Sequence, residues 1–262
     1  MVKQIYGTQK DLLARESMGL ITDDNQSIFD SAKIEIILST EMEVLPPQFL
    51  FMAFDPNGGG SSCACLISFT LERLNLTLVA MDTHPLKSSE EMQDFLMQHL
   101  AGIRGDARFK DSWIIFIAES NLGQEASHSA FFLRDQRRVW CISEKGRPGV
   151  NTTHDRKEKM VSSLLLFVNQ QAMSLYKNFI TTNTQLCAKT RREKTLEEFK
   201  KQFSSFRKIV SKPKEAWKLP RISYSGKGNG NNDDMIMTLL IGTWWAQRFC
   251  NREVAAPYED FI

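Results

Sequence analysis

Three strand-like segments follow one another in the first third of the chain, and they restrict its fold more than any other feature. Apolar runs at 49–54, 62–70 and 76–81 are separated only by short connections that contain Gly or Asn. Connections of this kind join antiparallel neighbours in a meander. The stretch "WIIFIAES" at 113–120 opens with a continuous apolar run, which is typical of a central strand buried on both faces. The sequence therefore predicts a sheet with an antiparallel part and a buried centre.

Helical patterns and further strands follow along the rest of the chain. Residues 88–103 open with a Ser N-cap and an acidic first turn, and their apolar residues recur at helical spacing. The other predicted elements are helices at about 156–180, 192–210 and 235–249, and short strands at 33–38, 138–143 and 221–225. We expect one α/β domain over 1–262, a mixed β-sheet flanked by helices, with 1–45 as an N-terminal extension.

Composition narrows the class of protein without naming a partner. The chain has 262 residues, of which 42% are hydrophobic, and this is enough for one sizeable core. A net charge of +2 indicates no particular partner. No run of 18 or more apolar residues occurs, so no membrane contact is expected. The four histidines are scattered, which argues against a structural zinc site.

Acidic residues stand where apolar elements begin or end. Asp55 ends "FLFMAF", Glu119 ends "WIIFIA", and Asp233 and Asp234 precede "MIMTLLIGTWWA". An ionised carboxylate near a core costs several kcal/mol unless it is paired or bound to a metal. We therefore expect these groups to meet at one edge of the sheet. Carboxylates suit Mg²⁺ or Mn²⁺, and two such ions about 3.5–4 Å apart serve phosphoryl transfer.

Each acidic position also has a structural interpretation. Asp55 precedes Pro-Asn-Gly, which is a common turn opening. Asp233 and Asp234 could cap the helix that follows them. Glu119 is harder to explain in this way, because Glu is seldom a turn residue at the end of a strand. The combination of positions favours a metal site.

Four segments together resemble a known family. "FMAFDPNGGGSS", "WIIFIAES" and "GNGNNDDMIMTLLIGTWW" occur in the order and rough spacing found in the nuclease domain of viral terminase large subunits, of herpesvirus and tailed-phage type. "GVNTTHDRK", at 149–157, is similar to the Gly-x-x-Thr-Thr…Lys segment of that family. The resemblance covers about residues 45–250. It implies an RNase H-like fold and a metal-dependent endonuclease that cuts concatemeric viral DNA during packaging.

The resemblance also implies the ligands and the partners. Asp55, Glu119, Asp233 and Asp234 would be the catalytic residues and would hold two Mg²⁺ or Mn²⁺ ions, without a choice between the adjacent pair. The implied partners are double-stranded DNA, the terminase ATPase motor, the small terminase subunit and the portal. No GxxxxGK[ST] occurs, so no ATPase domain is expected in this chain. The host nucleus is implied for a herpesvirus-like protein and the host cytoplasm for a phage-like one.

Two alternatives stay open at this point. The first is an RNase H-like resolvase or transposase nuclease, against which the "GVNTT…K" segment argues. The second is a DNA-binding or scaffold module without catalysis, in which the carboxylates are structural caps.

A basic segment is the other candidate for contact with DNA. Residues 187–218 hold eleven Lys or Arg against four Glu, so the segment carries +7 and the rest of the chain −5. Such a segment favours binding to phosphates, although charged helix faces are often merely solvated. Lys227, beside the acidic pair, and Lys157, after the Thr pair, lie next to the motifs. The predicted DNA-binding residues are Lys157, Lys189, Arg191, Arg192, Lys200, Lys201 and Lys227.

Overall fold

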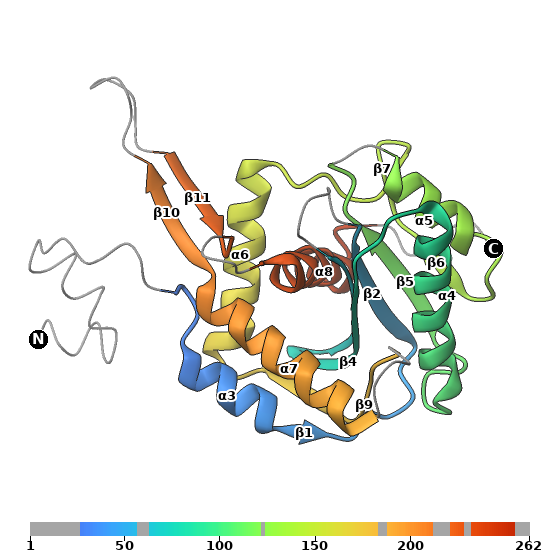
Figure 1. Ribbon diagram of the computed structural model, residues 1–262, viewed down its shortest axis with the longest axis horizontal. Coiled ribbons are helices and arrows are strands. Elements are labelled where there is room, and N and C mark those ends of the chain that lie inside the picture. Colours follow the sequence, from blue (N-terminus) through green and yellow to red (C-terminus); the bar gives the residue numbers. More distant parts are fainter. Residues whose placement is uncertain are drawn as a thin grey trace, which may run out of the picture.

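The structure, a computed structural model, describes residues 27–56, 63–121, 124–182, 188–211, 221–227 and 232–254. A seven-stranded sheet of order β1-β9-β4-β3-β2-β5-β6 runs through this part (Figure 1). Its strands are β1 Glu41–Met42, β2 Phe49–Asp55, β3 Ala64–Glu72, β4 Asn75–His84, β5 Trp113–Ala118, β6 Val139–Cys141 and β9 Met173–Ile180. Strands β2, β3 and β4 form the predicted antiparallel meander, and the other neighbours in the sheet are parallel. The predicted mixed sheet flanked by helices is confirmed.

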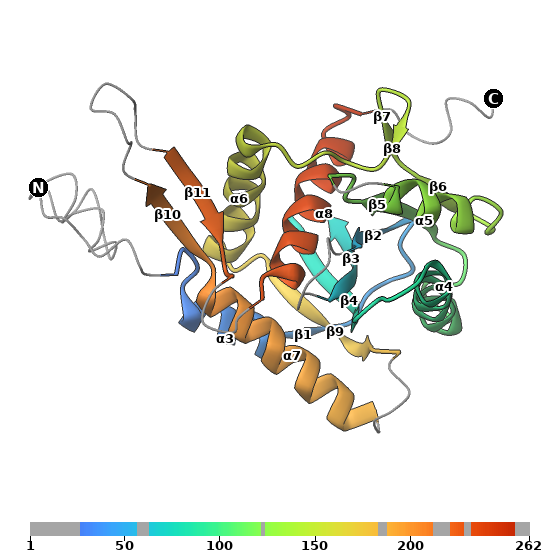
Figure 2. The ribbon, with the colours of Figure 1, turned by 45° about the horizontal axis from the view of Figure 1, so that its top comes forward.

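Helices cover both faces of this sheet (Figure 2). They are α3 Ser31–Ser39, α4 Ser89–Gly105, α5 Glu125–Leu133, α6 His154–Asn169, α7 Ala188–Ser205 and α8 Asp234–Cys250. Side chains of α3, α6, α7 and α8 share one buried cluster with the sheet, and side chains of α4 and α5 share the other. The sheet is therefore the middle layer of three.

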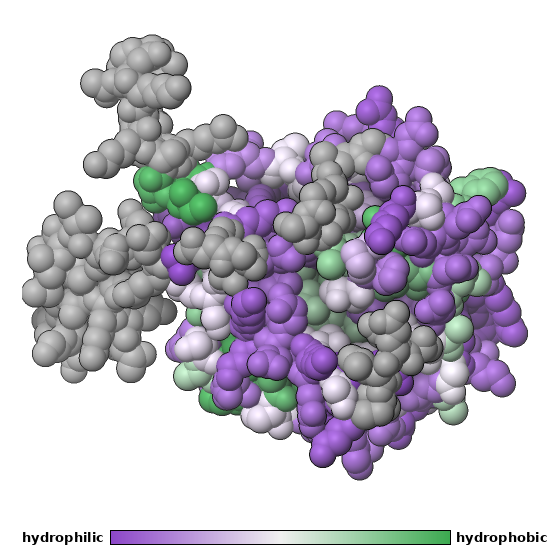
Figure 3. Space-filling model, in the orientation of Figure 1, coloured by the Kyte–Doolittle hydropathy of each residue, from purple (hydrophilic) through white to green (hydrophobic). Residues whose placement is uncertain are grey.

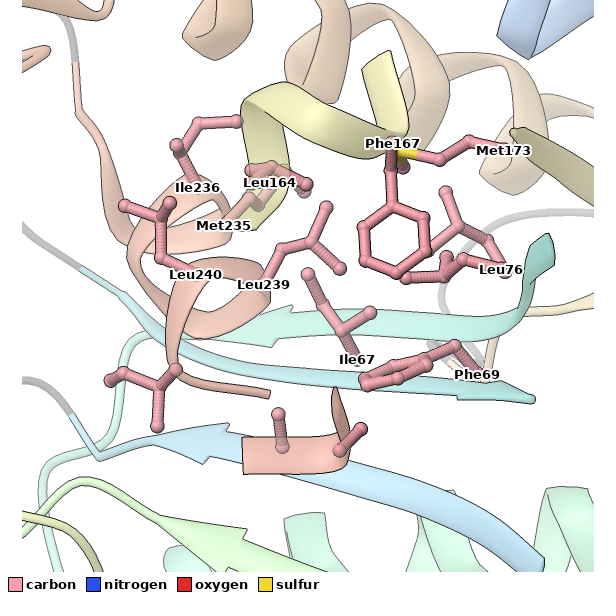
Figure 4. Close-up of a cluster of buried hydrophobic side chains, with 14 of the residues drawn as sticks. Ile67, Phe69, Leu76, Leu164, Phe167, Met173, Met235, Ile236, Leu239 and Leu240 are labelled. Carbon is pink, nitrogen blue, oxygen red and sulfur yellow. The ribbon is translucent and has the colours of Figure 1, made fainter. Parts of the chain in front are cut away.

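Helix α8 lies directly on the sheet. Its Met235 and Leu239 belong to the same buried cluster as Ile67 and Phe69 of β3 (Figure 4). Gly242 allows this approach, since a Cβ there would come within 2.8 Å of Ala53 Cβ and of the Phe69 ring. The helix is apolar on most sides because the sheet lies beneath it and α6 and α7 lie beside it.

The structure differs from the predictions at residues 33–38 and in the second part of the predicted helix at 156–180. Residues 33–38 belong to helix α3 and not to a strand, because the Asp30 side chain accepts the Ala32 N–H at 2.9 Å and caps a helix. The predicted helix at 156–180 ends at Asn169, and β9 occupies the second half. Gln171, with φ of 52°, makes the turn between them.

Two small hairpins lie outside the main sheet. The predicted helix at 192–210 ends at Ser205, and β10 (Arg207–Ser211) pairs with β11 (Arg221–Ser225) instead. Strands β7 (Ser143–Glu144) and β8 (Arg147–Pro148) form the second hairpin, which the sequence did not predict. Figure 3 shows a mostly hydrophilic surface with an apolar patch over the β10–β11 hairpin, where Ile209 and Val210 are exposed. In the described part of the chain, no helix combines the length and apolarity that a bilayer span requires.

Candidate active site

Two of the predicted ligands lie side by side at the carboxyl ends of parallel strands. Phe54 of β2 is opposite Ala118 of β5, so the next residues, Asp55 and Glu119, continue the register. The Glu119 N–H donates to Phe54 O at 2.8 Å. Side chains alternate along a strand, and Phe54 and Ala118 face the α4 cluster. Asp55 and Glu119 therefore both face the α8 side of the sheet.

The adjacent acidic pair reaches the same end of the sheet from above. Asp233 is 2% exposed and Asp234 is 4% exposed, at the start of α8. Asp234 Oδ2 accepts the Cys63 N–H at 3.0 Å, just before β3. Burial raises the pKa of the Cys65 thiol well above its usual value, and the negative charges of Asp55 and Asp234 raise it further. The carboxylates of Asp55 and Asp234 thus both act on the Cys65 thiol of β3.

Asp233 has one satisfied and one unsatisfied oxygen. Its Oδ2 accepts from Ser225 Oγ at 3.0 Å and from the Gly226 N–H at 2.9 Å. Its Oδ1 is buried and has no hydrogen-bond partner among the described residues. Asp233 stands at the N-cap position of α8, but its side chain makes no capping hydrogen bond. The structural interpretation as a cap therefore does not explain this carboxylate.

The other member of the pair, Asp234, accepts one hydrogen bond, from the Cys63 N–H at 3.0 Å. Burial raises the pKa of the Asp234 carboxyl, and the hydrogen bond from the Cys63 N–H and the charge of Lys227 oppose that rise. Both residues of the pair are buried.

Two lysines carry positive charge into the acidic group. Lys227 Nζ lies 3.7 Å from Asp233 Oδ1 and 3.8 Å from Asp234 Oδ1. Burial lowers the pKa of the Lys157 amine, while the charges of Asp233, Glu119 and Asp55 oppose that change. Lys157 is thus close enough to three of the predicted ligands to feel their charges. This places both lysines, which the sequence singled out, at the carboxylates.

Glu119 is fixed by residues to which the sequence analysis gave no role at the site. Its Oε1 accepts from Thr152 Oγ1 and from Asn121 Nδ2, the latter at 3.0 Å. Asn121 Oδ1 in turn accepts the Thr152 N–H at 2.7 Å. The segment after β8 runs beside Glu119, because Val150 N donates to Ala118 O at 2.7 Å. The Thr pair of the segment at 149–157 was the available signal, and its second member, Thr153, caps α6.

The donor set suits a hard divalent cation, since all four candidate ligands are carboxylates and one buried oxygen lacks a hydrogen bond. As the side chains stand, no three His, Cys, Asp or Glu of the described ranges are arranged to hold a metal ion together. The ammonium group of Lys227 lies beside the acidic pair and compensates its negative charge. The residues at 57–62, which include the predicted glycine loop, lie outside the described ranges.

The predicted basic face is only partly turned toward this site. On α7, Arg192 pairs with Glu41, Lys200 pairs with Glu35, and Lys201 is exposed. Lys189 Nζ lies 4.0 Å from Glu193 Oε1. The C-terminal end of α7 reaches the site, where Gln202 Oε1 accepts the Met235 N–H at 2.9 Å. Arg191 lies on the same helix, and positions 187 and 212–218 of the basic segment are outside the described ranges.

The arrangement of strands and helices is an RNase H-like fold, and it is the fold of viral terminase nuclease domains. The human cytomegalovirus terminase nuclease domain, Mn soaked and inhibitor bound, is similar to it with a TM-score of 0.62 and 12% identity, over 87% of this chain and 99% of that one. The nuclease domain of the large terminase subunit gp2 of bacterial virus Sf6 gives a TM-score of 0.51 at 7% identity, over 83% and 98%.

A longer large-terminase chain is similar over part of its length. The large terminase of a thermophilic bacteriophage gives a TM-score of 0.52 at 12% identity, over 89% of this chain. This chain spans 48% of that protein. No protein-family model matches the sequence, and no curated protein matches it either. The resemblance inferred from the four segments is confirmed at the level of the fold.

Proposed function

We propose that the chain is a metal-dependent DNA endonuclease of terminase type, which hydrolyses phosphodiester bonds of concatemeric viral DNA during genome packaging. One observation carries this proposal. Asp55 and Glu119 follow the same register at the ends of neighbouring parallel strands, and their charges and that of Asp233, at the start of α8, all act on Lys157. The convergence occurs in the fold of terminase nuclease domains, one of which was soaked with Mn.

The proposed site holds two Mg²⁺ or Mn²⁺ ions through Asp55, Glu119 and the Asp233/Asp234 pair. When bound, such ions supply an activated water and stabilise the leaving 3′ oxygen. Asp233 is the stronger ligand of the pair in this proposal, because its Oδ1 lacks a hydrogen bond and its charge acts on the same lysine as Glu119. Asn121 and Thr152 position Glu119 by occupying its Oε1.

The lysines neutralise the acidic group until cations and substrate arrive. Lys227 has a side chain that is 58% exposed, so it can leave the pair and reach a phosphate. Lys157 is more enclosed and stays beside the carboxylates. In this scheme the two amines reduce the repulsion among four carboxylates in the metal-free protein.

The test is cleavage of supercoiled plasmid by the purified protein with Mg²⁺ or Mn²⁺, compared with EDTA. We expect nicking with either metal and none with EDTA. Glu119→Gln keeps the size of the side chain and removes its charge, so nicking falls strongly while the melting temperature stays close to that of the original protein. Equal cleavage by the original protein in EDTA would overturn the metal mechanism.

A module that binds DNA without cutting it is the second candidate. It is favoured by the observation that no three potential ligands in the described ranges are already arranged for a metal. A Mn²⁺ titration separates the two candidates, because only the nuclease gains thermal stability from the ion. The resolvase or transposase alternative shares the fold, and the terminase neighbours favour the packaging nuclease over it.

The proposed partners follow from the same class. They are double-stranded DNA, the ATPase motor, the small terminase subunit and the portal. The proposed location is the host nucleus for a herpesvirus-like protein or the host cytoplasm for a phage-like one.

A further inference from the structure

A groove beside the carboxylates has the position and the charge of a nucleic-acid site. It has a volume of about 750 Å³ and lies between the β7–β8 hairpin, the start of α5 and the start of α6. Ser120, which follows Glu119 directly, forms part of its lining, together with Asn151 and Thr153. The groove therefore begins one residue from a proposed ligand.

The walls of this groove carry unbalanced positive charge. Its charged lining residues are Lys145, Arg147, Arg156 and Glu144, which leaves two positive charges in excess. Arg156 Nη1 pairs with Glu144 Oε2 at 2.5 Å, so these two compensate each other. Lys145 and Arg147 are exposed, and neither has an acidic partner in the described part of the chain.

Other hollows of the described surface fit a phosphate backbone less well. The larger one, of about 940 Å³ between α6 and α8, is lined by Arg156, Lys159 and Arg248 and by as many acidic side chains, so its charges cancel. A third, of about 280 Å³, is basic but lies near Lys110 and Arg137, which precede β5 and β6. Those residues are at the opposite end of the strands from Asp55 and Glu119.

The hairpin is attached firmly to the edge that carries Glu119. Gly149 has φ of 86°, and a Cβ there would come within 2.6 Å of Ala118 O. Its N–H donates to Ile142 O at 2.9 Å, and the Ser120 N–H donates to Val150 O at 2.9 Å. A rigid base of this kind keeps Lys145 and Arg147 at a fixed place relative to the carboxylates.

We propose that the groove between the β7–β8 hairpin and α6 binds the phosphodiester backbone of the strand being cut, and that Lys145 and Arg147 contact its phosphates. The inference rests on the proposed function for the position of the scissile bond. It assigns sequence-independent contacts to two residues that the basic segment of α7 does not include.

The experiment measures duplex DNA binding by fluorescence anisotropy in EDTA, at several salt concentrations. The groove variant is Lys145→Gln with Arg147→Gln, and the matched control is Lys110→Gln with Arg137→Gln, which removes the same charge at the opposite end. The slope of log K against log salt is negative. We expect its magnitude to decrease by about 1.8 for the groove variant, because each lost phosphate contact accounts for about 0.9. The control should leave the slope unchanged.

Equal slopes for the groove variant and the control would overturn the assignment. The readout is independent of cleavage, so it separates this inference from the proposed function. A protein that binds with the expected slope difference and never nicks plasmid would retain the groove and lose the nuclease assignment. A protein that nicks plasmid with equal slopes would retain the nuclease assignment and lose the groove.

Discussion

Two buried polar groups lie on opposite faces of the same sheet, a network around Asp82 and the cluster of candidate ligands, and they differ in how completely their polar atoms are hydrogen-bonded. On the α4 face, Asp82 accepts from the Thr182 N–H at 2.6 Å and pairs with His99 Nδ1 at 2.7 Å. His99 Nε2 lies 2.8 Å from Ser68 Oγ. On the α8 face, Asp233 keeps a buried oxygen without a hydrogen bond among the described residues. The first group is closed, and the second is open to a ligand.

The residue types alone do not tell which of the two groups is a candidate site. The number of hydrogen-bond partners and the solvent exposure of the side chains do. The sequence of contacts Asp82–His99–Ser68 is the one found in serine hydrolases. Here Ser68 and His99 have 0% exposure, so no substrate reaches them. A fully bonded buried network stabilises and specifies a core. An incompletely bonded carboxylate group, in contrast, has capacity left for a cation.

The largest expected effect comes from removing a carboxylate from the candidate site. Asp55→Ala removes a proposed ligand, so we expect at least a thousandfold loss of plasmid cleavage, which is about 4 kcal/mol in barrier. The free energy of unfolding should hold or rise in the metal-free protein, because repulsion among carboxylates falls. Cleavage assays and denaturant unfolding measure the two effects. Wild-type nicking by a folded Asp55→Ala protein would contradict the assignment of ligands.

Breaking the closed network should give the reverse pattern. His99→Ala leaves Asp82 buried without its ring partner, so we expect a loss of about 3 kcal/mol in the free energy of unfolding. Ser68→Ala is the milder control and should cost about 1 kcal/mol, since one hydrogen bond is lost. Cleavage per folded molecule should not change in either variant. A large fall in kcat without loss of stability would show that this network also serves the reaction.

Substitutions of the adjacent aspartates test whether the carboxylate with an oxygen that lacks a hydrogen bond matters more for cleavage. Asp233→Asn and Asp234→Asn should both lose activity and should differ by at least about tenfold, which corresponds to about 1.4 kcal/mol in barrier. We expect Asp233→Asn to be the more severe, because Asp233 Oδ1 is buried and has no hydrogen-bond partner among the described residues. Cleavage rates with Mg²⁺ and Mn²⁺ measure the difference. Wild-type rates in both would mean that the pair is only structural.

The smallest effect is expected on α7, outside both groups. Reversing the charges of Lys200 and Lys201 should weaken DNA binding similarly for unrelated sequences and flatten its salt dependence. Stability should change by about 0.5 kcal/mol or less, because the Lys200–Glu35 pair is on the surface. Anisotropy at several salt concentrations measures the binding. An unchanged slope would show that this helix does not touch phosphate.

Sequence patterns predicted the centre of the fold better than its margins. The strands 49–54, 62–70, 76–81 and 113–120 are recovered within a few residues, because their hydrophobicity reflects burial in the sheet. Strand β9 was missed, because its burial pattern does not alternate: four buried residues precede the exposed Lys177 and Asn178, and no Gly or Pro separates the strand from α6. The positive φ of Gln171 that ends the helix is not visible in the residue type.

Only those parts of the candidate site that depend on short stretches of sequence were predictable. Strand ends pointed to Asp55 and Glu119, because neighbouring parallel strands bring equivalent ends together. The groove was missed, because the short β7–β8 hairpin has too few residues for a strand pattern. The network of Asp82, His99 and Thr182 depends on elements far apart in the chain, so no spacing rule could reveal it.

Gly242 links the packing of the core to the geometry of the candidate site. It lies on α8 about two turns, or roughly 12 Å, from Asp234. It lets α8 pack closely on β2, because an added Cβ would come within 2.8 Å of Ala53 Cβ. Strand β2 ends at Asp55 and α8 begins beside Asp233. The separation of ligands on the two elements is therefore inherited from packing density at a buried contact. A methyl group added at this position would therefore alter the spacing on which the proposed reaction depends.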